Sequence, residues 1–187
     1  MKPIFSAREW AIAQAAMAAV LLLLIPLVNL LAPGGDRLVS VLHGAASFVT
    51  VALACQAIHQ LYPLLRGKEG AAARLELTLW LTNALVLATI VFGNWLYIDY
   101  RLPDQAQQWL LFNNPAGHSI IMEFKEFVSL FPLPLGVGAA WILRRFRESL
   151  PGKPDVASAA ALLVTLMWGT LLCGLVFGLA LAKLKLV

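Results

Sequence analysis

The stretch that decides this fold is NPAGHSIIMEFKEFVSLFPLPLG, residues 114–136. Asn114 is a suitable helix cap, and Pro115 suits the first helical position, where no backbone N–H is needed. The stretch continues into an apolar run, and the whole segment is long enough to cross a bilayer. Pro132 and Pro134 lack the N–H that a helix interior requires, so they predict a kink or break near mid-membrane.

Four ionisable side chains lie within this predicted span: His118, Glu123, Lys125 and Glu126. Ionisable groups inside a membrane are costly and by default mark function. Quinol oxidation needs a protonatable group near the redox centre, because protons must leave with the electrons. Glu123, Lys125 and Glu126 are therefore candidate catalytic residues; the alternatives are an ion pair that fixes the bundle or a contact with another subunit. Adjacent residues of a helix do not face each other, so Lys125 and Glu126 are not expected to pair directly.

The composition is that of an integral membrane protein. The 187 residues are 60% hydrophobic and 13% charged, whereas a soluble domain is roughly half apolar and a quarter charged. The net charge of +4 falls in the connections between apolar runs, so it does not indicate nucleic acid. Cys55 and Cys173 lie in apolar runs without a CxxC or CxxCH motif. A disulfide scaffold, thioredoxin chemistry and covalent haem attachment are therefore not indicated.

Five apolar runs are long enough to cross a membrane. We therefore expect an all-α bundle of five transmembrane helices, a single transmembrane domain over residues 1–187. The runs lie at about 10–32, 38–63, 75–98, 115–144 and 157–182. The connections on one side hold nine basic residues and those on the other hold four: Lys2, Arg8, Arg66, Lys68, Arg74, Arg144, Arg145, Arg147 and Lys153 against Arg37, Arg101, Lys183 and Lys185. Because basic loops stay cytoplasmic, we expect a bacterial inner-membrane protein with its N-terminus in the cytoplasm and its C-terminus outside.

His43 and His118 are the candidate haem and metal ligands. They lie about six and about four residues inside helices that descend from the same side, so their predicted depths differ by only a few ångströms. Two imidazoles at one depth could ligate a haem b from opposite faces, because the porphyrin supplies only four donors to the iron. Small side chains share a face with His43 and would leave room for a flat macrocycle, although close helix packing uses the same residues: Ser47, Thr50, Ala54 and Ala57.

Other interpretations of these residues stay open. His43 and His118 could instead hydrogen-bond neighbouring helices, or hold a metal ion without haem. The sulfur of Met122, one turn after His118, is an alternative ligand. Arg101 could neutralise haem propionates or anchor its helix at the interface. His59 has no histidine partner at its own depth, which disfavours a second bis-histidine haem.

Two more runs carry packing patterns. In the 75–98 run, one stripe holds Thr78, Thr82, Thr89, Gly93 and Tyr97. In the 157–182 run, the row Gly174, Gly178 and Ala182 indicates a close helix contact, within the protein or with another subunit. The loop at 102–113 contains the apolar sequence WLLF, which is too short to span and suits the membrane surface or a partner.

Through His43-Gly44, His118, the four or five spans and the basic cytoplasmic side, the chain resembles small bacterial membrane cytochromes b of the b561-like kind. The resemblance covers the second to the fourth span. It implies axial-ligand roles for His43 and His118 alone, since those families often hold two haems through four histidines and this chain lacks them.

Together these patterns predict a membrane electron-transfer subunit with one haem b near the outer face, exchanging electrons with quinone or a periplasmic carrier. The alternative is a non-catalytic subunit of a larger respiratory or photosynthetic complex, contacting other subunits through Gly174, Gly178 and the 102–113 loop. A small transporter or proton channel that uses the same charges is a third hypothesis. Whether the chain is itself an enzyme stays open, and no nucleotide-binding loop, nucleophile triad or zinc pattern supports a hydrolase.

Overall fold

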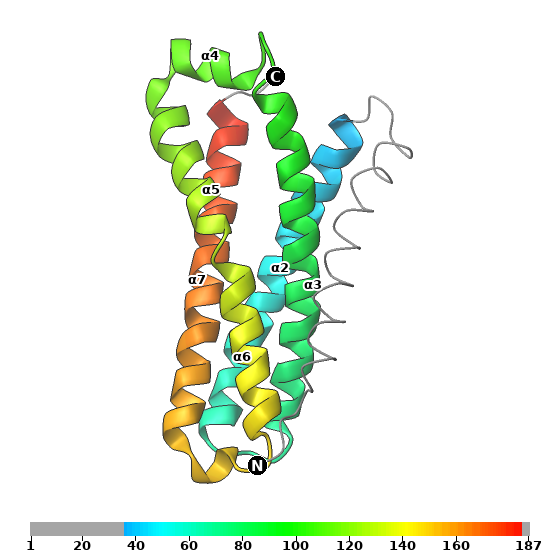
Figure 1. Cartoon of the computed structure of the whole chain (residues 1–187), viewed down its shortest axis with the longest axis vertical. Helices are drawn as coiled ribbons and strands as arrows, with labels where there is room; N and C mark the ends of the chain where they lie inside the picture. The colour runs from blue at the N-terminus through cyan, green and yellow to red at the C-terminus, as the bar shows by residue number, and fades with distance from the viewer. Residues whose placement is uncertain (1–35, 185–187) are drawn as a thin grey trace, which may run out of the picture.

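The computed structural model describes residues 36–184, which are almost entirely helical (Figure 1). Within this range there is no β-strand, so the prediction of an all-α fold is confirmed for this part of the chain. The elements in chain order are α2 (Asp36–Leu65), α3 (Ala71–Tyr100), α4 (Ala106–Asn113), the π-helix η1 (Gly117–Met122), α5 (Glu123–Ser129), α6 (Pro132–Phe146), the 3₁₀ turn η2 (Leu150–Gly152) and α7 (Pro154–Leu184).

Four helical segments of the described chain are long and apolar enough to cross a membrane: Leu38–Leu65, Ala71–Tyr100, Gly117–Phe146 and Pro154–Leu184. They confirm the predicted runs at 38–63, 75–98, 115–144 and 157–182. The fifth predicted run, 10–32, lies outside the described residues. The chain therefore has the helices of a multi-pass membrane bundle, and the side on which each terminus lies stays a prediction.

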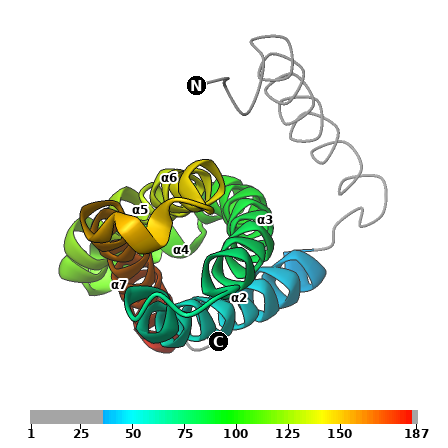
Figure 2. The ribbon, with the colours of Figure 1, turned by 90° about the horizontal axis from the view of Figure 1, so that it is seen from below.

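One half of the bundle is close-packed, and we call it the closed half. Here α2, α3, α6 and α7 each contact two of the other three and form a ring (Figure 2). Alanines let the helix backbones approach, and larger apolar side chains fill the centre: Ala54, Ala57, Ala139, Ala140 and Ala160 with Leu75, Leu79, Leu143 and Met167, all fully buried. The hydrophobic core of the described residues is therefore concentrated in this half.

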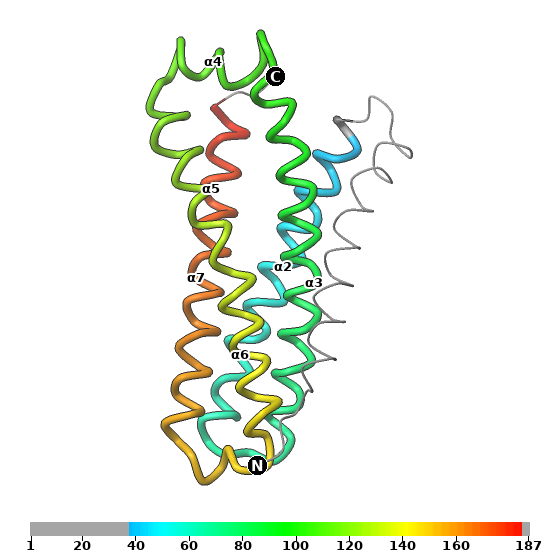
Figure 3. The backbone as a smooth tube through the Cα atoms, in the orientation of Figure 1, coloured from blue at the N-terminus to red at the C-terminus, as the bar shows by residue number. Residues whose placement is uncertain are grey.

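The helix that carries the decisive stretch is interrupted where the two prolines predict it. α5 ends at Ser129 and α6 begins at Pro132, because Pro132 and Pro134 cannot donate the backbone hydrogen bonds that would continue the helix. The backbone N–H groups of Leu130 and Phe131 instead donate to the carbonyls three residues earlier, those of Phe127 and Val128, as in a 3₁₀ turn. The two parts of the segment pack differently. α6, which follows the break, belongs to the ring and packs against both α3 and α7, whereas α5, which precedes the break, packs along α7 (Figure 3).

A buried carboxylate ties the closed half together at its end. Glu76 of α3 is only 5% exposed and forms ion pairs with Arg144 and Arg147 at the end of α6. A buried charge without such partners would be strongly destabilising. The basic run at the end of α6, predicted as a topology signal, thus also neutralises Glu76, a charge that falls inside a predicted apolar run.

A matched pair of glycines on α6 tests this packing. A Cβ atom at Gly136 would collide with Oδ1 of Asn83 and lie 2.7 Å from the Met167 sulfur, whereas a Cβ at Gly138 would meet only Leu163 at 3.7 Å. We expect Gly136→Ala to lower the free energy of unfolding by about 1–3 kcal/mol through overpacking. Gly138→Ala should be neutral or slightly stabilising, since alanine favours helix. Thermal unfolding in detergent measures both, and equal stability of the two variants would contradict the close contact at Gly136.

Candidate functional site

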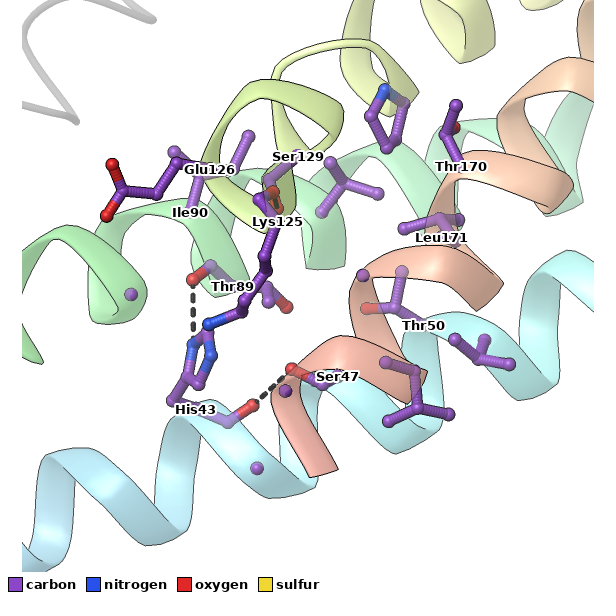
Figure 4. A pocket seen from close by; sticks show the side chains of 18 of the residues that line it. His43, Ser47, Thr50, Thr89, Ile90, Lys125, Glu126, Ser129, Thr170 and Leu171 are labelled. Carbon is purple, nitrogen blue, oxygen red and sulfur yellow. Dashed lines mark hydrogen bonds between the residues drawn. The ribbon is translucent and has the colours of Figure 1, made fainter. Parts of the chain in front are cut away.

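The candidate site is a cavity in the other half of the bundle, which we call the open half. It has a volume of about 640 Å³ and lies between α2, α3, α5 and α7 (Figure 4). Its floor includes Thr50, Val86 and Pro132, at the level where the closed core begins. Small residues of three helices widen it: Gly44 and Ser47 of α2, Gly93 of α3, and Gly174 and Gly178 of α7. The cavity exists because α5, freed by the proline break, does not take the place that α6 holds below.

His43 is fixed on the wall of this cavity by its contact with α3. Its Nδ1–H donates to the carbonyl oxygen of Thr89 at 3.0 Å, and the ring lies directly over Gly93, where a Cβ atom would approach Cε1 to 3.0 Å. A neutral imidazole that donates through Nδ1 keeps a lone pair on Nε2. Since the Thr89 carbonyl takes the Nδ1 proton, Nε2 is the nitrogen of His43 that can accept a hydrogen bond or a proton.

Lys125 enters the same cavity from α5. Its side chain points toward His43 (Figure 4), and its stem lies over α7, with Cε 3.6 Å from the position of a Cβ at Gly178. Among the described residues no carboxylate lies within ion-pair distance of its ammonium group. The site thus presents a cation and an imidazole to one cavity inside an apolar bundle.

Glu126 lies on another side of α5 and points away from His43 (Figure 4). Among the described residues it forms no ion pair with Lys125. Its Oε1 atom and the Oη atom of Tyr97 are both buried without a hydrogen-bond partner among the described residues. Arg101 lies at the end of α3 with its guanidinium carbon 4.5 Å from the centre of the Tyr97 ring, so it stacks on a tyrosine that lines the cavity.

His118 lies apart from this cavity, in the π-helix η1. It is 7% exposed, and both of its ring nitrogens are engaged. Nδ1 and the Tyr100 hydroxyl share a hydrogen bond of 2.7 Å, while the Gln107 amide donates to Nε2 at 3.2 Å. Oε1 of Glu123 lies 3.6 Å from the same Nε2. Three elements, α3, α4 and α5, therefore meet at this imidazole, and π-helical turns of this kind are frequent at functional sites.

The structure does not bring His43 and His118 to one depth. His43 packs against Thr89 and Gly93, whereas His118 contacts Tyr100, seven residues further along α3 than Gly93 and so about 10 Å further along its axis. Two axial ligands must approach a single iron from opposite faces. His43 and His118 in this arrangement do not fit one bis-histidine haem. The reason is that α2 begins at a lower level than the α4 end of the bundle (Figure 1), which counting along each helix separately does not reveal.

Other predicted site residues have separate places. Met122 and Glu123 both line the cavity with His43, and Glu123 also approaches Nε2 of His118. Within the described part of the chain there is no cluster of three or more histidine, cysteine, aspartate or glutamate side chains that could hold a metal ion. Tyr100 and Gln107, which hold His118, lack any sequence motif, and only their place at a helix end and in an amphipathic loop could have suggested them.

The two regions predicted to contact other subunits, the glycine row of α7 and the 102–113 loop, differ in what they contact. A Cβ atom at Gly174 would lie 3.8 Å from the Ser129 hydroxyl, and one at Gly178 would meet Lys125, so this glycine row contacts α5 within the chain. The 102–113 loop forms α4, whose Leu110 is buried while Phe112 is 88% exposed. An apolar face thus stays uncovered on α4. No family model, curated protein or solved structure matches this chain.

The separation of the two histidines has a spectroscopic consequence. Purified chain that is incubated with excess ferric haem and repurified should give no low-spin bis-histidine spectrum, because His118 keeps both hydrogen bonds and does not reach the cavity. His118→Ala should give the same spectrum as the wild type. His59→Ala, a change of an exposed histidine on α2, controls for adventitious binding. A sharp α band after reduction that is lost in both His43→Ala and His118→Ala, but kept in His59→Ala, would contradict this arrangement.

Proposed function

We propose that this chain is a quinone-binding subunit of a membrane electron-transfer complex. The observation that supports it is the convergence of His43 and Lys125 on one cavity within the membrane-spanning part of the bundle. Cavities of about 300–1,000 Å³ with a few convergent polar groups are typical of small-molecule sites, and this cavity, at about 640 Å³, lies in that range.

The rim of the cavity indicates that its ligand comes from the lipid. Several rim side chains are apolar and exposed on the outside of the bundle: Phe48, Phe127, Leu130 and Leu179. Helices of this length and composition are surrounded by lipid, so these side chains face acyl chains. A ligand with a polar head and an apolar tail can place its head between His43 and Lys125 while the tail leaves through this rim.

The available hydrogen-bonding groups suit a quinone head. Five hydroxyl side chains that line the cavity already donate to carbonyls of their own helices: Ser47, Thr50, Thr89, Ser129 and Thr170. Lys125 supplies a charged donor for a ring carbonyl oxygen beside the Tyr97 hydroxyl, which also lines the cavity, and Nε2 of His43 is an acceptor for a ring hydroxyl. A quinone presents carbonyls when oxidised and hydroxyls when reduced, so this donor and this acceptor serve both states.

The exposed aromatic face of α4 supports the proposal that the chain is one subunit of a larger complex. Phe112 is almost fully exposed, and Trp109 and Leu111 are exposed beside it. A short amphipathic helix of this kind lies along a membrane surface or against a partner. Electrons from a quinol need a one-electron acceptor, and in this proposal a neighbouring subunit supplies it.

Binding of a short-tailed quinone such as decylubiquinone to the detergent-purified chain tests the proposal. We expect Lys125→Met to weaken binding about 10- to 100-fold, because a hydrogen bond to a charged group contributes about 1.5–3 kcal/mol. His43→Gln should weaken binding of the reduced form more than that of the oxidised form. His59→Gln, on the same helix, and Lys68→Met, in an exposed turn, are matched controls that should bind as the wild type does. Absence of binding to folded wild-type protein, or equal binding by Lys125→Met, would refute the proposal.

A further inference from the structure

A second, smaller cavity continues from the candidate site toward α4. Its volume is about 260 Å³. It shares His43, Tyr97 and Lys125 with the main cavity and extends to Tyr100 and to Leu110 of α4. Space that begins beside the proposed quinone head therefore reaches the tyrosine that holds His118.

Titratable groups continue from that tyrosine to the surface. The Tyr100 hydroxyl and Nδ1 of His118 are 2.7 Å apart, and Oε1 of Glu123 lies 3.6 Å from Nε2 on the other side of the ring. His118 is buried, whereas the side chain of Glu123 is 51% exposed. An imidazole can take up a proton on one nitrogen and release one from the other. The line from Tyr100 through His118 thus ends on Glu123, a half-exposed carboxylate that also lines the main cavity.

Tyr97 joins this line to the main cavity. Its ring stacks on Tyr100 with ring centres 5.7 Å apart and an interplanar angle of 14°. Its Oη atom, like Oε1 of Glu126, is buried without a hydrogen-bond partner among the described residues. Buried polar atoms are nearly always hydrogen-bonded, and where the protein offers no partner they bind ordered water. Tyr97 thus brings a buried hydroxyl group on the wall of the main cavity next to the ring of Tyr100.

We propose that Tyr97, Tyr100, His118 and Glu123 form a proton path between the quinone cavity and the α4 end of the bundle. This inference rests on the proposed function. When a quinol is oxidised it loses two protons and two electrons and becomes a quinone. The electrons go to a one-electron acceptor in the neighbouring subunit. His43 Nε2 takes up the proton of the ring hydroxyl, and the path passes protons on to the exposed carboxylate of Glu123. The same groups serve proton uptake when a quinone is reduced.

The alternative role of His118 is to hold α4 against α3 and α5, and one residue separates the two roles. Gln107 hydrogen-bonds His118 from α4 but does not titrate at any ordinary pH. Gln107→Leu therefore removes a tie to α4 and leaves the proton carriers in place. Tyr100→Phe removes a proton carrier and keeps the ring.

The experiment uses the full chain in nanodiscs, loaded with decylubiquinol and mixed rapidly with ferricyanide as the one-electron acceptor. Quinone formation is followed by ultraviolet absorbance, and proton release by a pH-sensitive dye. We expect Tyr100→Phe and His118→Ala to slow oxidation by roughly a hundredfold, as for loss of a general acid–base group. Their quinol affinity should equal that of the wild type. Added imidazole should restore the rate of His118→Ala, and Gln107→Leu should oxidise quinol at the wild-type rate.

The outcomes separate this inference from the function on which it rests. If the wild type binds quinol and both variants oxidise it at the wild-type rate, the proton path is wrong and the quinone site stands. If Gln107→Leu is as slow as His118→Ala and imidazole restores neither, His118 has a purely structural role and the path is again refuted. If the folded wild type binds no quinol, the proposed function fails and the path fails with it.

Discussion

The constraint on which the rest of this structure depends is the missing N–H of two prolines. Pro132 and Pro134 cannot donate to the carbonyls one turn earlier, so the third membrane-spanning segment divides into α5 and α6. A continuous helix would lie between α3 and α7 over its whole length and would fill the bundle with side chains. Because the segment breaks, only α6 occupies that place, and α5 packs mainly against α7. The cavity is the space that this difference leaves.

The two halves on either side of this break are held together by different kinds of contact. In the closed half, alanines on all four helices permit close approach of the backbones, and Glu76 joins α3 to the end of α6 through Arg144 and Arg147. The open half has no comparable core among the described residues, and polar contacts take its place: His43 with Thr89, and His118 with Tyr100 and Gln107. The close-packed core and the cavity thus lie in opposite halves of the bundle, which share α2, α3 and α7 and differ in having α6 or α5.

Much of this architecture was predictable from the sequence, because length, apolarity and proline have local effects. Four spans, the break at Pro132 and the stripe of Thr89, Gly93 and Tyr97 on the cavity wall all follow from patterns within one segment. The predicted equal depth of His43 and His118 is not found in the structure, because the relative depth of two residues depends on how far one helix is displaced along another. Glu76 was missed for a related reason: its partners come from a different helix 68 and 71 residues later in the chain.

The glycine row of α7 shows how a pattern can predict a close helix contact without identifying the helix that makes it. Gly174 and Gly178 were expected to permit a close contact, and they do, but the close neighbours are Ser129 and the stem of Lys125 within the same chain. A lysine stem that lies over glycine can run along the helix surface and place its ammonium group in the cavity; a larger residue at position 178 would push that stem outward. The cost of a cation inside the membrane is reduced because the ammonium group points into the cavity toward His43. Of the two contacts that the row predicted, one within the protein and one with another subunit, the structure shows the contact within the chain, and this contact positions the stem of Lys125.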